Sequence, residues 1–76
     1  MDHLTDPVEL GAAIRRARQA DRLTQRELAG VCGCSPRFIV ELEQGKPTAQ
    51  IGKVMHVLRM LGLRLAIASR EGPHAS

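Results

Sequence analysis

The chain has 76 residues, a formal net charge of +3 and a pI near 9.5, which suits a polyanionic partner. A chain of this length makes one small domain that buries only about 60 to 65% of its surface, so a dimer would help its stability. With one Phe and no Trp or Tyr, it lacks the stacking platforms that bind single-stranded nucleic acid, and duplex DNA is the better target.

The chain opens with a short unpatterned segment and a first helix. Residues 1–5 are expected to be a disordered N-terminus. Asp6, Pro7 and Glu9 then indicate a helix start, because they supply a cap, a proline at the first helical position and an acid in the first turn. The apolar stripe of this helix recurs at steps of three and four residues, at Leu10, Ala13, Ile14 and Ala17.

The stretch from Thr24 to Gly45 is typical of two short helices joined by a tight turn. Thr24 followed by Glu27 is a capping box, and Ser35 followed by Pro36 caps a second helix. Gly33 can adopt the left-handed conformation that the corner between them requires. This pattern predicts a helix-turn-helix, whose outward face is where such motifs read DNA. The basic residues gather before and within it, at Arg15, Arg16, Arg18, Arg22, Arg26 and Arg37.

A loop and a last helix complete a predicted DNA-binding domain over residues 6–62. Lys46, next to Pro47, can meet a DNA phosphate together with backbone N–H groups of the loop. Thr48 is expected to cap the last helix, and Gly62 to end it. The apolar positions of this helix are Ile51, Val54, Leu58 and Leu61.

Beyond Gly62 the apolar period changes from helical to two. Leu63, Leu65 and Ile67 alternate with Arg64, Ala66 and Ala68, which predicts one strand over residues 63–68. A lone apolar strand in a helical chain needs a partner. We therefore predict that it pairs with the same strand of a second copy, with Leu63, Leu65 and Ile67 in the dimer interface. Residues 69–76 are expected to be a flexible tail.

The helix-turn-helix residues resemble the lambda-type repressor superfamily. The matching positions are Thr24, Gln25, Leu28, Ala29, Gly33, Ser35, Ile39, Glu43 and Gly45. The resemblance implies that the helix from Ser35 is the recognition helix, that Gln25 holds a phosphate and that Arg18 pairs with Glu43. Pro36 stands where many relatives carry a base-contacting side chain, so base contacts are assigned to Arg37, Ser35 and Glu41. Gln44 and Lys46 are expected to hold phosphates beside Gln25.

Helices followed by one strand are similar, over Asp6 to Ala68, to HipB-like antitoxins of the Xre type. That resemblance implies a mainly all-α bundle of four to five helices, with one C-terminal β-strand paired across a homodimer. It also implies an antitoxin that binds DNA, represses its own operon and inactivates a HipA-like serine/threonine kinase toxin. A dimer of this type is expected to bind a double-stranded DNA operator with an inverted repeat.

Other functions remain open. A stand-alone phage-type or Xre-type regulator would have no toxin, and a protein-interaction module would have lost DNA binding. An enzyme is not expected, because no nucleophile with a base, phosphate loop or ligand cluster stands out. Cys32 and Cys34 form a C-x-C without a second ligand pair, so we predict no metal or cofactor. No apolar run approaches the roughly 20 residues of a membrane span, and a cytoplasmic, nucleoid-associated protein is expected.

Overall fold

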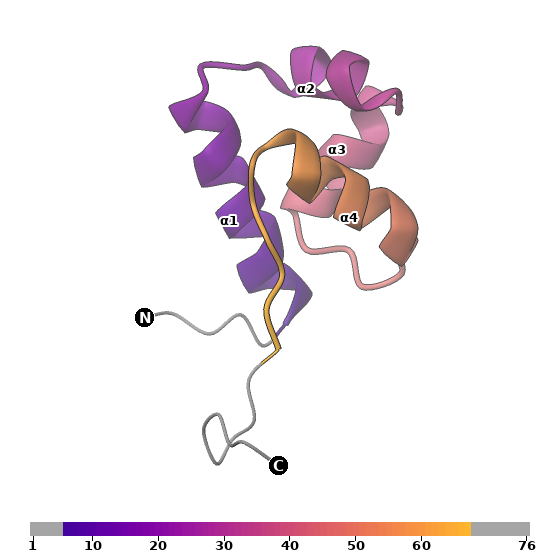
Figure 1. Ribbon diagram of the computed structural model, residues 1–76. Coiled ribbons are helices and arrows are strands. Elements are labelled where there is room, and N and C mark those ends of the chain that lie inside the picture. The colour runs from indigo at the N-terminus through magenta and orange to yellow at the C-terminus, as the bar shows by residue number, and fades with distance from the viewer. Residues whose placement is uncertain (1–5, 68–76) are drawn as a thin grey trace.

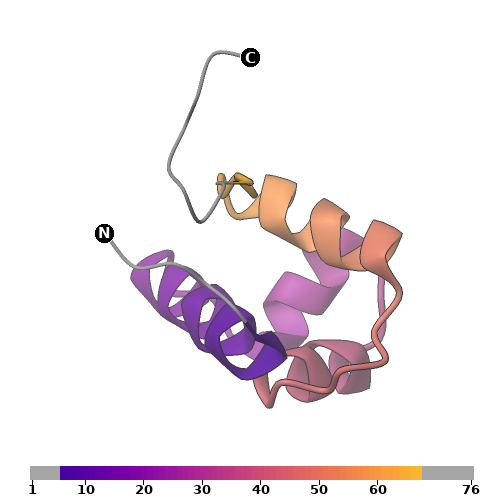
Figure 2. The same ribbon diagram turned by 90° about the horizontal axis from the view of Figure 1, so that it is seen from below.

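The computed structural model describes residues 6–67, which fold into four α-helices. These are α1 (Pro7–Ala20), α2 (Gln25–Cys32), α3 (Pro36–Glu43) and α4 (Ile51–Met60). α3 packs against α1 and α2, and α2 also packs against α4 (Figure 1, Figure 2). The predicted fold class, a mainly all-α helix-turn-helix bundle, is confirmed. None of the four helices has the length and apolarity needed to span a bilayer.

Three helices begin at the predicted capping residues, which are Asp6 for α1, Thr24 for α2 and Ser35 for α3. Each side-chain oxygen accepts a hydrogen bond from the backbone N–H three residues further on, at 2.8, 3.0 and 3.1 Å respectively. At α2 the capping box is complete, because Glu27 Oε1 accepts from the Thr24 N–H at 2.8 Å. Local sequence therefore sets where these helices start.

α4 differs from the prediction at its start. Thr48 is not its cap, because the helix begins at Ile51, after Gln50, whose side chain makes no capping hydrogen bond. The chain needs two more residues to bring Ala49 against the core before the helix begins. Ile51 consequently lies in the first turn and is 65% exposed instead of buried, whereas Val57, which the predicted stripe omitted, is buried in the core.

The core lies where the four helices meet. Each helix contributes one large side chain that is fully buried. In chain order these are Ile14, Leu28, Ile39 and Val57. These large apolar side chains fix the inner face of α3, because Ile39 cannot leave the core without opening a cavity. The opposite face of α3 is thereby held toward solvent.

The backbone of α1 lies directly against the backbone at the C-terminal end of α3, with no side chain between them. A Cβ placed on Gly11 would overlap Leu42 O and lie 2.7 Å from Glu43 O. A second contact of this kind follows, since a Cβ on Gly45 would lie 2.7 Å from Val8 Cα. Only glycine fits at these two positions, and the end of α3 is seated directly on α1.

The segment after α4 forms no strand within the described residues. Gly62, with φ 73°, follows the helix as predicted. Leu65 is 47% exposed and lines an apolar groove with Leu10 and Ile51, while Ile67 is fully exposed. A single chain offers this segment no strand partner, so pairing with a second copy stays a prediction. Ala68 lies outside the described residues, as do residues 1–5 and 69–76.

Candidate nucleic-acid interface

A glycine corner joins α2 to α3. Gly33 has φ 70°, in the left-handed region. The Gly33 N–H donates to Gly30 O at 3.3 Å and the Cys34 N–H donates to Ala29 O at 3.0 Å, which satisfies carbonyl groups at the end of α2. The predicted corner is confirmed, and it places Ser35 at the start of α3.

The solvent face of α3 carries the residues assigned to base reading. The Arg37 side chain is 86% exposed and that of Glu41 is 30% exposed. The Ser35 hydroxyl accepts the Phe38 N–H, which leaves its own hydrogen available to donate. Gln44, the residue that follows α3, is also exposed. Each of these side chains is accessible to a partner on this face.

Arg37, Glu41 and Lys46 form one surface cluster. Arg37 Nε donates to Glu41 Oε2 at 3.4 Å, and Lys46 Nζ donates to Glu41 Oε1 at 3.3 Å. The hydrogen bond from Lys46 is the main cause that lowers the pKa of Glu41, and Arg37 adds to it. These ion pairs were not predicted, although the spacing of four residues between Arg37 and Glu41 on one helix indicates the first.

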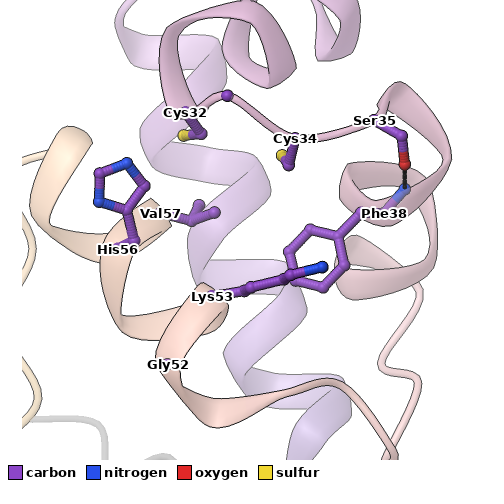
Figure 3. A pocket seen from close by; sticks show the side chains of 9 residues that line it. Cys32, Cys34, Ser35, Phe38, Gly52, Lys53, His56 and Val57 are labelled. Atoms are coloured by element: carbon purple, nitrogen blue, oxygen red, sulfur yellow. Dashed lines mark hydrogen bonds between the residues drawn. The ribbon is translucent and has the colours of Figure 1, made fainter.

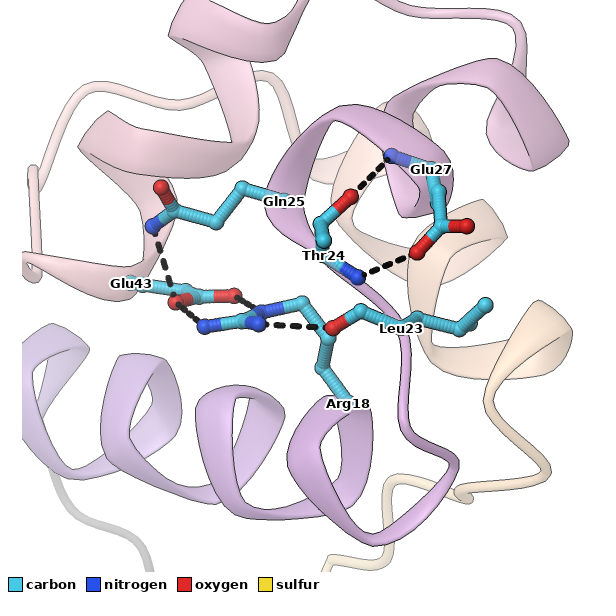
Figure 4. A network of polar contacts seen from close by, with 6 residues as sticks. All are labelled: Arg18, Leu23, Thr24, Gln25, Glu27 and Glu43. Atoms are coloured by element: carbon cyan, nitrogen blue, oxygen red, sulfur yellow. Dashed lines mark hydrogen bonds and ion pairs between the residues drawn. The ribbon is translucent and has the colours of Figure 1, made fainter.

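Behind this surface, a buried ion pair holds three elements together (Figure 4). Arg18 of α1 is only 9% exposed. Its Nε donates to Glu43 Oε2 at 2.6 Å and its Nη2 to Glu43 Oε1 at 3.0 Å, and Nη1 donates to Leu23 O at 2.8 Å. The expected pairing of Arg18 with Glu43 is present, and the hydrogen bond to Glu43 raises the pKa of the Arg18 guanidinium. The pair ties the end of α3 to α1 and to the segment before α2.

Gln25 joins the same network. Its Nε2 donates to Glu43 Oε1 at 3.1 Å, so the side chain is directed toward the end of α3 (Figure 4). The amide nitrogen carries two hydrogens, and this bond uses one of them. Gln25 can therefore keep its place on Glu43 and still donate to a second acceptor.

The amino-acid sequence matches the family model of a helix-turn-helix domain over residues 9–66. This chain belongs to the helix-turn-helix family. An uncharacterised HTH-type transcriptional regulator, y4mF of Sinorhizobium fredii (strain NBRC 101917 / NGR234), is 56% identical to this helix-turn-helix protein over 61 residues, which are 80% of each chain. The family assignment therefore covers most of the chain.

Solved structures of HipB share the fold of this helix-turn-helix protein. The HipB-O4 20mer complex gives a TM-score of 0.82, and the HipA-HipB-O2-O3 complex gives 0.83. Each match covers 92% of this chain and 99% of that chain, at 23% sequence identity. At this identity the likeness concerns the fold, and the resemblance to HipB-like proteins is confirmed at that level.

A cavity of about 460 Å³ lies between the glycine corner and α4 of the helix-turn-helix protein (Figure 3). Cys32, Cys34 and His56 line it, and Lys53 Nζ lies 5.7 Å from the centroid of the Phe38 ring. Burial raises the pKa of both thiols, which keeps them protonated at neutral pH and poorly nucleophilic. Both cysteines thus behave as small apolar residues at the corner.

Proposed function

We propose that this helix-turn-helix protein is a dimeric, sequence-specific repressor that binds duplex DNA and serves as the antitoxin of a type II toxin-antitoxin pair. In this role it represses its own operon and neutralises a HipA-like serine/threonine kinase in the cytoplasm. The solvent face of α3, with Arg37, Glu41 and nearby Lys46, carries the proposal. The chain is similar in fold to HipB, which has been solved in complexes with a 20mer and with HipA. This likeness supports both a DNA partner and a kinase partner.

Arg37 is assigned to read a base edge in the major groove. Arginine can donate two hydrogen bonds to guanine, and the bond to Glu41 involves only Nε, which leaves both Nη atoms to donate. The Glu41 carboxylate can accept from a cytosine amino group. Ser35 adds one hydroxyl donor at the start of the same helix. Together the three side chains supply a donor and acceptor pattern that can distinguish base pairs.

Gln25, Gln44 and Lys46 are assigned to DNA phosphates. Gln25 has one amide hydrogen left beyond its bond to Glu43, and Gln44 and Lys46 are exposed at the end of α3. Side chains that flank a helix in the major groove meet the phosphates that border the groove, and such contacts fix position without reading sequence. These residues should therefore act equally on all DNA sequences.

The two classes of contact predict different responses to mutation. Arg37→Ala should cost about 1 to 3 kcal/mol at the operator and relax sequence preference, because a base contact is lost. Lys46→Ala should weaken binding to all duplexes similarly and reduce the salt slope by about one. Fluorescence anisotropy titrations with operator and random duplexes, each over a range of salt, measure both effects. Equal losses on the two duplexes for Arg37→Ala would reject its assignment to a base.

Dimerisation is proposed because one helix in one groove reads too few base pairs to be specific within a genome. The exposed apolar side chains of Leu65, Ile67 and Ile51 supply a surface that a second copy can cover. If the 63–68 segments pair across a two-fold axis, the two α3 helices are fixed at one separation. The operator is then an inverted repeat whose half-sites lie about one helical turn, roughly 34 Å, or a multiple of it apart.

Leu65→Lys should shift the protein toward monomer and weaken operator binding, because it places a charge in the apolar interface. Ala66→Lys is the matched control, since it adds the same charge to the other side of the predicted strand. Analytical ultracentrifugation beside a binding titration measures both properties. A Leu65→Lys variant that stays dimeric with unchanged operator affinity would show that the segment is not the dimer element.

A stand-alone transcriptional regulator is the second candidate, favoured by the name of the Sinorhizobium fredii relative. It would bind an operator without a toxin, whereas an interaction module would bind no operator at all. Mixing the protein with a HipA-like kinase encoded beside its gene separates these functions. Formation of a stable complex and loss of kinase activity support the antitoxin, while operator binding without either effect supports the stand-alone regulator.

A further inference from the structure

Two exposed arginines beside the start of α2 have no partner in the described part of the chain. Arg22 lies in the segment between α1 and α2, and Arg26 lies in the first turn of α2. Neither side chain makes an ion pair or a hydrogen bond within residues 6–67. The nearby carboxylate of Glu27 is hydrogen-bonded to the Thr24 N–H instead. The surface around α2 therefore presents two uncompensated positive charges.

Arg22 also occupies a backbone conformation that an arginine does not favour. Its φ is 59°, and it is the one residue other than glycine with positive φ in the described chain. Glycine adopts this left-handed conformation without the steric cost that a Cβ brings. The Arg22 side chain does not offset that cost through a hydrogen bond or an ion pair within residues 6–67.

Arg26 is likewise poorly placed for the stability of its own helix. It stands in the first turn of α2, where the aligned peptide dipoles favour a negative side chain and disfavour a positive one. Glu27 fills the favourable acidic position next to it. Folding thus gains nothing evident from a positive charge at either Arg22 or Arg26.

Both arginines lie within three residues of Gln25, which is assigned to a DNA phosphate. Gln25 lies next to Arg26 in the sequence, and its side chain reaches Glu43 at the end of α3 (Figure 4). A helix in the major groove is bordered on both sides by phosphates, so cationic side chains beside its end are positioned to meet them. An acidic protein surface could also attract two arginines, but continuity with α3 favours the nucleic acid.

We propose that Arg22 and Arg26 bind phosphates of the operator duplex and extend the DNA contact from α3 onto the α1–α2 segment and the first turn of α2. This inference rests on the proposed function and adds two residues to the contact. Each arginine neutralises a phosphate and releases its condensed counterions on binding. The contacts strengthen binding to every duplex and carry no base preference.

Arg22→Gly tests the inference, because it should move stability and DNA affinity in opposite directions. The melting temperature should rise by about 3 to 5 °C, since glycine relieves the left-handed strain. Affinity should fall by the same factor on operator and random duplexes. The slope of log K against log salt, measured between about 50 and 200 mM KCl, should fall in magnitude by about 0.9, and by about 1.8 when Arg26→Gln is added.

Two controls separate the effects of charge and backbone strain at Arg22 from the effect of the protein's overall charge. Arg22→Lys keeps the charge and the strained backbone, so its salt slope and melting temperature should stay near those of the unmodified protein. Arg16→Gln removes another exposed arginine, from the side of α1 opposite the buried Gly11, Ile14 and Arg18, and its salt slope should be unchanged.

The outcomes distinguish this inference from the proposed function. If the unmodified protein binds duplex DNA but Arg22→Gly and the double variant keep its salt slope, Arg22 and Arg26 are not phosphate ligands and the inference is overturned alone. If the slope falls equally for Arg16→Gln, the effect is one of overall charge and the inference is again overturned. Failure of the unmodified protein to bind any duplex overturns the proposed function as well.

Discussion

Glu43→Ala is expected to destabilise the protein by about 3 to 5 kcal/mol, the loss typical of breaking a buried ion pair from one side. Arg18, which is 9% exposed in the structure, would lose the carboxylate that now accepts hydrogen bonds from its Nε and Nη2. Gln25 would lose its acceptor at the same time. The free energy of unfolding from urea denaturation at neutral pH measures the loss.

A second substitution shows whether the unpaired charge is the cause. Arg18→Met added to Glu43→Ala should recover part of the lost stability, because an apolar side chain of similar length can fill the site without desolvating a charge. The coupling between the two substitutions should exceed the roughly 0.5 kcal/mol expected for independent sites. Strict additivity would mean that the pair contributes orientation but little mutual stabilisation. Glu43→Gln, which keeps an acceptor oxygen, provides a folded reference if the alanine variant fails to fold.

The second large effect is expected at Gly11, where alanine should destabilise the protein by about 2 kcal/mol. The added methyl group would press on Leu42 O and Glu43 O and move α1 away from α3. This cost outweighs the gain of about 1 kcal/mol that alanine normally brings to a helix interior. Thermal and urea unfolding of the two proteins measure the difference.

Gly30 provides the matched control for Gly11. It also lies inside a helix, but a Cβ there would meet no atom within 4 Å. Gly30→Ala should therefore stabilise the protein by up to about 1 kcal/mol through helix propensity alone. If the two alanine variants change stability in the same direction, the close approach of α1 to α3 does not govern the effect at Gly11.

Local signals explain which parts of the fold could be predicted from sequence. The capping box at Thr24, the Ser35 and Pro36 pair and the turn at Gly33 depend only on neighbouring residues, and all are as predicted. Thr48 was predicted as a cap on the same kind of local signal. The predicted cap is wrong because the position of α4 is set by packing of Ala49 against the core, which local sequence does not encode.

The candidate site divides in the same way. The outward position of Arg37 follows from the helical spacing of Ile39 and Leu42, and it could be derived from the sequence. The pairing of Arg18 with Glu43 spans 25 residues and came from family resemblance, since no periodicity relates two residues on different helices. The left-handed backbone of Arg22 has no sequence signal, because the turn residues that favour that conformation are glycine and asparagine.

The seating of α3 on α1 has a consequence for how an operator would be selected. Gly11 and Arg18 both hold the C-terminal end of α3, one through backbone contact and the other through a buried ion pair. Rotating α3 to follow an irregular groove would disturb both contacts, so the protein has little freedom to adapt. In the proposed complex, a mismatch between the spacing of the two α3 helices and that of the two grooves would be met by bending or twisting of the duplex. Base pairs that deform easily at the centre of the operator would then raise affinity without being touched by any side chain.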